Sequence, residues 1–383
     1  MSLVVYILFV KYDKRTSLNI KGVCKYAGAF KDMNRRNLLV FYLILQLNFV
    51  SAKWSTTNSM HFGRYMHSAV LLSNGKLLVN GGYDSDPIAY AELYDPVSQT
   101  WIDTNLLNGN RYAHTASILQ TGQILIVGGR SNHDSSIDTC ELYNSSTGTW
   151  TYTSVMTVPR CYHTALVLSN GDVFVTGGFG LSNELNSVEA YNPLNRTWTA
   201  IRSMLNARYL HTASLLSNGK ILVAGGRNFN TQLNSAELFD PSTKLWTATG
   251  NMNYARVGHT ATVLSNGKVL VIGGEGDYAN TAEIYDPTTG VWTLTKNMSV
   301  YRSFHTSTSL SNGQVLVTGG LLYNSTGLLT ELFDSTSETW ISAGTMNQTR
   351  RYHRATVLSN GNLVITGGIN GQHATNFVEF YSQ

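Results

Sequence analysis

Pairs of adjacent glycines recur seven times along the chain, at a period of about 48 residues. The pairs are Gly81-Gly82, Gly128-Gly129, Gly177-Gly178, Gly225-Gly226, Gly273-Gly274, Gly319-Gly320 and Gly367-Gly368. An Arg stands 17 residues before the first glycine of every pair, and a His follows three residues later, giving Arg64/His67, Arg111/His114, Arg160/His163, Arg208/His211, Arg256/His259, Arg302/His305 and Arg350/His353. A fixed period of this length predicts a repeat protein whose copies bury apolar surface against their neighbours.

Each copy contains the pattern of four short β-strands. A Glu follows each glycine pair, with an aromatic residue two positions later and, in six copies, a Trp seven residues after that aromatic. Apolar runs alternate with turn residues at intervals too short for helices. Ser-Asn-Gly joins the first two strands in six copies, as at Asn74-Gly75, and predicts a type I′ hairpin turn with positive φ at both central residues.

These copies predict an all-β fold, a seven-bladed β-propeller built from four-stranded antiparallel blades. The seventh Trp, Trp54, precedes the first Arg. We therefore expect its segment to form the outer strand of the last blade, whose inner strands come from residues 350–381. The expected propeller domain is residues 53–383, and deleting residues 53–60 should destabilise the whole ring because it opens a sheet edge.

The Gly-Gly, Glu-x-aromatic and Trp spacing resembles the kelch repeat over residues 54–381. The Arg-x-x-His, Leu-Ser-Asn-Gly and Glu-Leu-Tyr-Asp-Pro segments are similar to the central propeller of the galactose oxidase family. This resemblance implies the propeller fold. Kelch propellers serve as adaptors, receptors, lectin-like modules and, in a few cases, enzymes, so the fold leaves the function open.

A segment of different character precedes the repeats. Residues 33–52 combine a basic start, an apolar stretch over 38–50 and two small residues at the end, which is the layout of a secretory signal peptide. Residues 1–32 lie upstream of that pattern, so we expect translation to start at Met33. Secretion is the expected localisation, and membrane anchoring through residues 38–50 is the alternative, although this stretch is shorter than a spanning helix.

Five Asn-x-Ser/Thr sequences between predicted strands support export as candidate glycosylation sites, namely Asn144, Asn195, Asn297, Asn324 and Asn347. Several would arise by chance in a chain rich in Ser, Thr and Asn. Glycans on the last three would obstruct blades five to seven, so a protein partner would favour blades one to four.

Charge and cysteine content exclude two classes of function. Residues 1–52 hold eight of the 27 basic and two of the 23 acidic residues, which leaves 19 basic and 21 acidic residues in the repeats. Without a basic surface, nucleic acid is not an expected partner. The repeats contain two cysteines, Cys140 and Cys161, without zinc-binding spacing. A disulfide between them is possible in an oxidising compartment, and two separate, half-buried thiols are the favoured interpretation.

Residues that occur in every blade cannot mark one unique active site. We interpret the repeated Arg, Glu and His as architectural: Arg and Glu would pair between strands, and His would cap backbone groups, because buried charges need such partners. No catalytic residue, cofactor or metal is assigned on this basis.

Residues that break the repeat are the candidates for recognition. Antiparallel order places the loops after strands two and four on one face, and these loops vary in sequence. They carry the histidines outside the repeat together with nearby acidic residues, which suggests a cation or acidic pocket as an alternative to simple solvation: His61, Asp84, Asp86, His133, Asp134 and His373. Aromatic residues between Arg and His begin the inner strands at the channel mouth, where packing is the favoured role and ligand contact the alternative: Tyr65, Tyr112, Tyr162, Tyr209, Phe304 and Tyr352.

The sequence thus favours a secreted or lumenal, monomeric binding module that recognises a protein or glycan through the variable face. One alternative is an oxidoreductase similar to the copper radical oxidases, suggested by Cys161-Tyr162-His163 and Tyr352-His353. Both histidines belong to the repeated motif, which weakens this alternative. An intracellular kelch adaptor is a further alternative, and it leaves the leader unexplained.

Overall fold

A computed structural model describes residues 10–11, 19–20, 53–132, 134–321 and 327–382, which divide between two compact units, Met1–Ser51 and Ala52–Gln383. In the first unit, β1 (Val10–Lys11) pairs with β2 (Asn19–Ile20). The predicted signal segment, 33–52, lies outside the described residues. No helix in the described part of the chain is long and apolar enough to span a bilayer.

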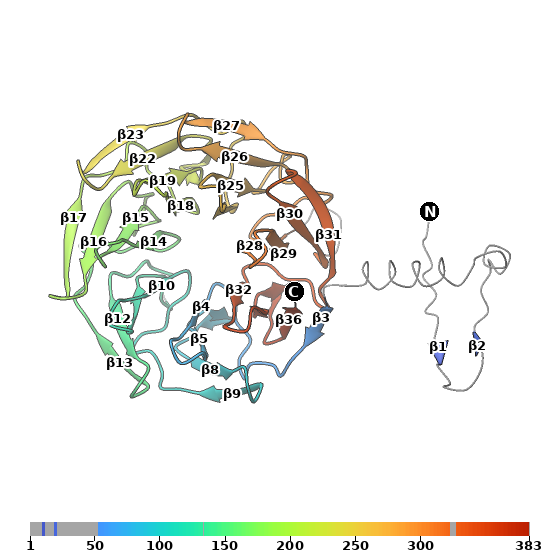
Figure 1. Cartoon of the computed structure of the whole chain (residues 1–383). Helices are drawn as coiled ribbons and strands as arrows, with labels where there is room; N and C mark the ends of the chain where they lie inside the picture. Colours follow the sequence, from blue (N-terminus) through green and yellow to red (C-terminus); the bar gives the residue numbers. More distant parts are fainter. Residues whose placement is uncertain (1–9, 12–18, 21–52, 133, 322–326, 383) are drawn as a thin grey trace. The chain divides into compact units, whose positions relative to one another are not determined.

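The second unit is a ring of seven four-stranded antiparallel sheets, as predicted (Figure 1). First strands of successive blades contact one another around the centre, so each blade runs outward from its first strand. Blade one contains β4 (Ser68–Leu71), β5 (Leu77–Asn80), β8 (Ala91–Asp95) and β9 (Thr100–Asp103). Blade two contains β10 (Thr115–Ile118), β11 (Ile124–Val127), β12 (Cys140–Asn144) and β13 (Thr149–Tyr152). Blade three contains β14 (Thr164–Val167), β15 (Val173–Thr176), β16 (Val188–Asn192) and β17 (Thr197–Ile201).

The remaining blades follow the same order. Blade four contains β18 (Thr212–Leu215), β19 (Ile221–Ala224), β22 (Ala236–Asp240) and β23 (Leu245–Ala248). Blade five contains β24 (Thr260–Val263), β25 (Val269–Ile272), β26 (Ala282–Asp286) and β27 (Val291–Leu294). Blade six contains β28 (Thr306–Ser309), β29 (Val315–Thr318), β30 (Leu329–Asp334) and β31 (Thr339–Thr345).

Loops between second and third strands carry small hairpins in blades one, four and seven: β6 (Tyr83–Asp84) with β7 (Asp86–Pro87), β20 (Arg227–Asn228) with β21 (Thr231–Gln232), and β34 (Ile369–Asn370) with β35 (His373–Ala374).

Blade seven joins the two ends of the ring. Its strands are β32 (Arg354–Val357), β33 (Leu363–Thr366), β36 (Val378–Ser382) and, outermost, β3 (Lys53–Thr56). Trp54 lies opposite Tyr381 in the β3–β36 register. Its indole Nε1 donates to the Ala343 carbonyl of blade six at 3.1 Å. The predicted closure of the ring through Trp54 is therefore confirmed.

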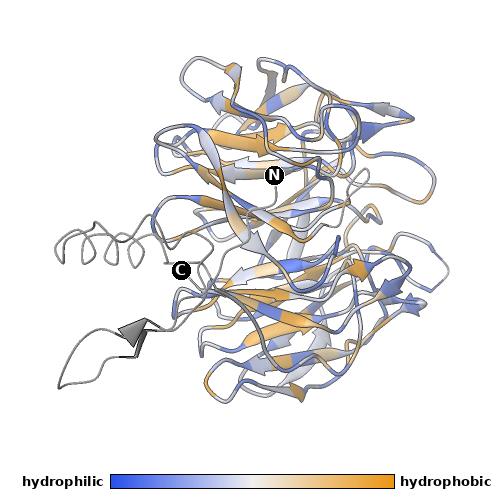
Figure 2. Cartoon of the chain, turned by 90° about the vertical axis from the view of Figure 1, so that its right-hand side faces the viewer, coloured by the Kyte–Doolittle hydropathy of each residue, from blue (hydrophilic) through white to orange (hydrophobic). Residues whose placement is uncertain are grey.

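Apolar residues of adjacent blades form the cores. In one core, Leu78 of blade one packs with Ile124, Ile126 and Trp150 of blade two, and another joins blades six and seven through Leu316 and Ile365. Figure 2 shows hydrophobic residues along the strands, while many loop residues are hydrophilic. Burial against neighbouring blades on both faces explains why the first three residues of each second strand are all apolar rather than alternating.

The glycine pairs permit close contact between blades. Gly128 and Gly129 have φ of 57° and 107°, and the N–H of Gly129 donates to the Arg160 carbonyl of the next blade at 2.9 Å. A Cβ on Gly128 would lie 2.4 Å from that same carbonyl oxygen. Only glycine fits here, because any side chain would both strain φ and push the blades apart.

The turn between the first two strands differs from the prediction. Gly75 has φ of 80°, whereas Asn74 has no positive φ, so the type I′ assignment is wrong. The Gly75 N–H donates to the Leu72 carbonyl at 2.9 Å, and the Leu72 N–H donates to the Lys76 carbonyl at 2.8 Å. Ser-Asn-Gly is therefore a three-residue loop in which glycine alone takes the left-handed conformation.

Candidate functional site

The repeated Arg and Glu side chains form seven buried ion pairs, one within each blade. Their N–O distances are 2.6–3.0 Å in Arg64–Glu92, Arg111–Glu141, Arg160–Glu189, Arg208–Glu237, Arg256–Glu283, Arg302–Glu331 and Arg350–Glu379. Each carboxylate also accepts at least one backbone N–H group from the loop that enters the blade, as Glu141 does from Asn108 and Gly109. The predicted pairing is confirmed, and it satisfies these charges inside the ring.

The repeated histidines bind side chains of the preceding blade rather than backbone groups, which corrects the prediction that they cap backbone. The Nε2 of His163 lies 2.9 Å from the hydroxyl of Thr115, and the Nε2 of His114 lies 3.1 Å from Oδ1 of Asn80. Burial lowers the pKa of all seven, so they are neutral at physiological pH.

The residues that precede these histidines form a closed belt, here called the collar: Met66, Ala113, Tyr162, Leu210, Gly258, Phe304 and Tyr352. The N–H of each donates to the collar carbonyl of the preceding blade at 2.8–3.4 Å, and the N–H of Met66 completes the belt by donating to Tyr352. All seven have φ of 51–64°. This left-handed conformation is rare outside glycine, so a shared tertiary contact must stabilise it.

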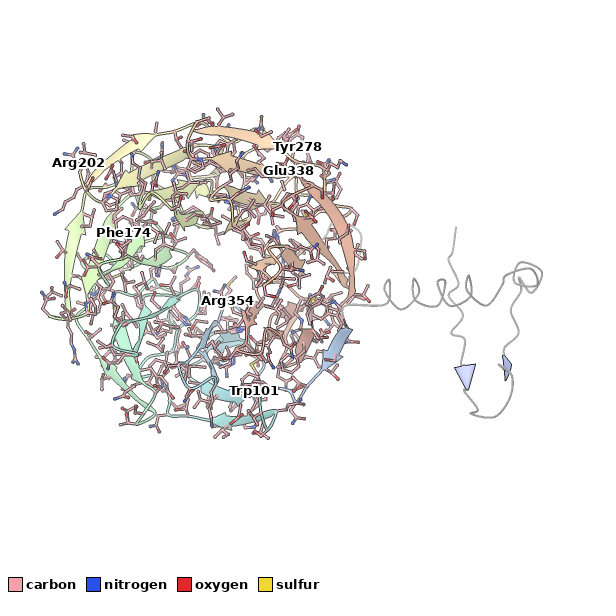
Figure 3. The ribbon with its side chains drawn as sticks, in the orientation of Figure 1. Trp101, Phe174, Arg202, Tyr278, Glu338 and Arg354 are labelled. Carbon is pink, nitrogen blue, oxygen red and sulfur yellow. The ribbon has the colours of Figure 1, made fainter. Side chains whose placement is uncertain are left out.

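Beneath the collar lies a central cavity of about 240 Å³. It is lined by the collar, by six of the repeated histidines and by Thr115, Thr260 and Arg354. Figure 3 places the Arg354 side chain in the central opening. The sequence interpretation missed this residue, although a signal exists. The position after the repeated His is Thr in five blades and Ser in one, and is Arg in blade seven alone.

The aromatic residues between Arg and His occupy two different places. Tyr162, Phe304 and Tyr352 belong to the collar and line the cavity. Tyr65, Tyr112 and Tyr209 stand one position earlier and form single bridges to the residue after their own blade's glycine pair. Rings meet between neighbouring blades at this level, as in Tyr83–Tyr112 at 5.0 Å and Phe179–Tyr209 at 5.6 Å.

Asp134 forms local contacts with blade two. Its carboxylate accepts a 2.5 Å hydrogen bond from the Tyr112 hydroxyl and lies 3.0 Å from Nη2 of Arg130. Burial, together with this bond, raises the pKa of Tyr112. These contacts show that two of the candidate residues, Tyr112 and Asp134, meet in one polar cluster beside the loop of residues 130–139.

Among the described residues, the candidate cation ligands do not come together as a set. His61 Nδ1 lies 2.6 Å from Asp103, and this hydrogen bond raises the pKa of His61. With Glu92 they form a group compact enough for a metal ion within the described residues, but Glu92 is already paired with Arg64. Asp84, Asp86 and His373 are exposed in the β6–β7 and β34–β35 hairpins, and His133 lies outside the described residues.

Exposed apolar side chains occur in the loops of the variable face. In the loops between second and third strands, Leu181 is 68% and Phe229 is 76% exposed. Tyr278, also exposed, stacks on Tyr254 with ring centroids 3.9 Å apart and lies at the rim of the ring in Figure 3. Phe229 is at the tip of the β20–β21 hairpin with φ of 51°, so a strained backbone presents an aromatic ring to solvent.

The glycosylation candidates differ in their surroundings. Asn144 and Asn195 lie at the turns between third and fourth strands, on the face opposite the variable loops, and Asn297 is exposed in the loop after β27. The Nδ2 of Asn347 donates to Glu379 at 2.9 Å, so attachment of a glycan there would have to replace a bond to a buried carboxylate. Asn324 lies outside the described residues.

The two cysteines of the repeats are separate thiols, as favoured by the sequence, but they are fully buried rather than half-buried. Burial raises the pKa of Cys140 to about 12 and that of Cys161 to about 11. The Cys161 sulfur accepts a hydrogen bond from Ser136 at 3.3 Å. Both therefore remain protonated and unreactive at neutral pH.

Residues suggested by the oxidase resemblance do not fit a copper centre. The Nε2 atoms of His163 and His353 are occupied by threonine hydroxyls. The Tyr162 hydroxyl lies 3.7 Å from the Met66 sulfur, and the neighbouring Cys161 points to Ser136 instead. These side chains serve contacts between blades.

Residues 43–274 match the family described as the Attractin/LZTR1 β-propeller, and residues 210–382 match the KLHDC2/KLHL20/DRC7 kelch-repeats domain. No curated protein matches the sequence.

The solved structure of a fungal alcohol oxidase of the AA5 family, in complex with copper, is similar to this fold, with a TM-score of 0.71. It is 18% identical, over 87% of this chain and 76% of that chain. At this identity the likeness shows a shared fold alone. Since the first match covers more than half of the sequence and the repeat is that of kelch proteins, the chain belongs to the kelch-repeat propellers of the Attractin/LZTR1 β-propeller family.

Proposed function

We propose that this protein is a secreted or lumenal binding module, which recognises a protein or glycan partner through the loops that follow the second and fourth strands of its blades. The main support is the presence of exposed aromatic side chains in these loops. The repeated side chains are used inside the ring, whereas Phe229 and Tyr278 present exposed rings in the loops after second strands, beside the exposed Leu181. Exposed apolar groups of this kind commonly mark interaction surfaces.

The chemistry of that face suits either class of partner. Aromatic rings stack on sugar faces and also provide large contact area to a protein at small entropic cost. Charged pairs lie among them, including Arg227–Glu275 at 2.6 Å and Arg130–Asp134 at 3.0 Å. Such half-exposed pairs set the orientation of a partner more than its affinity. The proposed secretion rests on the pattern of residues 33–52 and on the glycosylation sequences.

A ligand screen with paired variants tests this proposal. The full chain, expressed in a secreting eukaryotic host, is applied to arrays of extracellular protein domains and of glycans. For each ligand found, Leu181→Ser with Phe229→Ser should weaken binding by roughly thirty-fold or more, since a central apolar contact contributes at least about 2 kcal/mol. Surface plasmon resonance measures the change.

Val97 and Leu194 provide the matched control. They are 94% and 88% exposed, in turns between third and fourth strands on the opposite face. Val97→Ser with Leu194→Ser should leave affinity unchanged. Equal loss in both double variants, or loss only in the control, would contradict recognition by the variable face.

A further inference from the structure

Arg354 replaces the Thr or Ser that follows the repeated His in the other blades. In most blades the corresponding hydroxyl, such as that of Thr115, Thr212 or Thr260, binds the histidine of the next blade. Blade seven has no hydroxyl at this position, and Thr366 of β33 binds His67 instead, at 3.0 Å. The His67 ring of blade one thus has its hydroxyl partner without a Thr at position 354.

The charge of Arg354 is not balanced by a carboxylate. Its Nε donates to the His67 carbonyl at 2.7 Å, and no described residue accepts a hydrogen bond from Nη1 or Nη2. This contrasts with the seven repeated arginines, each of which has its own Glu. The cavity lining contains no Asp or Glu, and the histidines around it are neutral. The Arg354 side chain is exposed to the central opening, and a guanidinium remains charged in proteins.

The cavity has room for a small ligand at this cation. Its volume of about 240 Å³ exceeds that of several water molecules, each of which occupies about 30 Å³ in the liquid. The Nε bond to the His67 carbonyl anchors the guanidinium, which leaves its outer nitrogens to act as a planar fork. A planar fork of this kind matches the oxygens of a carboxylate, phosphate or sulfate group.

We propose that the central cavity beneath the collar is a binding site for a small oxyanion, held by the guanidinium of Arg354. The ligand class is a free carboxylate, phosphate or sulfate. This site lies on the channel axis, so it is separate from the loop face of the proposed function and independent of any partner bound there. The anion would balance the charge that blade seven alone introduces into the channel.

Calorimetry and thermal unfolding of the full chain test this site. Phosphate, sulfate and malonate are titrated separately, with sodium chloride at equal ionic strength as the reference. We expect one or more of the three oxyanions to bind saturably with one site per chain and to raise Tm beyond the chloride reference. The anion that saturates at the lowest concentration identifies the ligand class.

Arg354→Thr introduces the residue found in five other blades, so it should fold, and the loss of the bond from Nε to the His67 carbonyl should change Tm by a few degrees at most. It should weaken oxyanion binding at least about ten-fold, because it removes a bidentate charged contact. Arg202→Thr, at an exposed outer position (Figure 3), is the control and should bind as the unmodified chain does. The proposal is overturned if no oxyanion binds beyond the chloride reference, if Arg354→Thr retains binding, or if both variants lose it equally.

Discussion

A chain that lacks only residues 53–60 is expected to unfold as a whole ring rather than lose one strand. This segment contacts three blades: Trp54 donates to Ala343 of blade six, β3 pairs with β36 of blade seven, and Met60 is buried against blade one. Removing the partly buried Trp54 and the buried Met60 costs up to about 5–10 kcal/mol together. That is comparable to the roughly 5–15 kcal/mol of net stability of a folded domain.

Circular dichroism during heating measures this effect, with the yield of soluble protein as a second readout. Trp54→Phe is the control, because it keeps an aromatic ring in place and removes the indole N–H bond. It should cost about 1 kcal/mol. If the deleted protein unfolds cooperatively within a few degrees of the unmodified chain, the segment does not close the ring.

Glu141→Ala should produce the second large loss of stability, about 3–5 kcal/mol. The substitution leaves the guanidinium of Arg111 buried without a counter-charge, and it removes the acceptor for the N–H groups of Asn108 and Gly109. Denaturant unfolding followed by tryptophan fluorescence gives the change in free energy of unfolding.

Two further variants separate charge from volume. Replacing both partners, Arg111→Met with Glu141→Leu, should recover part of the loss, because no unpaired charge remains. Lys76→Ala breaks the surface pair with Asp95, at 3.2 Å, and should cost at most about 1 kcal/mol. A loss for Glu141→Ala as small as that for Lys76→Ala would contradict the structural role of the buried pairs.

The fold could be predicted from the sequence because each repeat position has one physical task. Glycine pairs mark close contacts of backbone, Arg and Glu mark an internal ion pair, and Trp marks the outer strand. Trp54 was informative because it lies before the first copy of the repeat, whereas the last copy has no Trp of its own. Together these two facts predicted that the N-terminal segment completes the last blade. The type I′ prediction, which relied on the repeated Asn-Gly pair, was wrong. Asn-Gly alone does not reveal loop length, which here includes the preceding Ser.

The candidate site was harder to predict because it depends on how blades meet. Periodicity gave the repeated aromatic residues, but not the division between collar residues such as Tyr162 and bridging residues such as Tyr112. The belt of collar hydrogen bonds requires left-handed φ at Met66 and Leu210, for which side-chain type gives no signal. Arg354 is visible in the sequence as an exception at a Thr or Ser position, but its place in the central opening depends on how the blades close the ring.

The central claim is that the N-terminal strand closes the ring in a fixed register with the C-terminal blade. Ser55 lies opposite Phe380 in that register, whereas Tyr381 lies opposite Trp54. Directly opposed residues of antiparallel strands are close enough for a disulfide.

Oxidation of the Ser55→Cys, Phe380→Cys variant, followed by peptide mapping in a mass spectrometer, tests this claim most directly. The closed ring predicts a quantitative link between the peptides that contain positions 55 and 380, and little link in Ser55→Cys with Tyr381→Cys. Absence of the first link, or equal linkage in both variants, would contradict closure in this register.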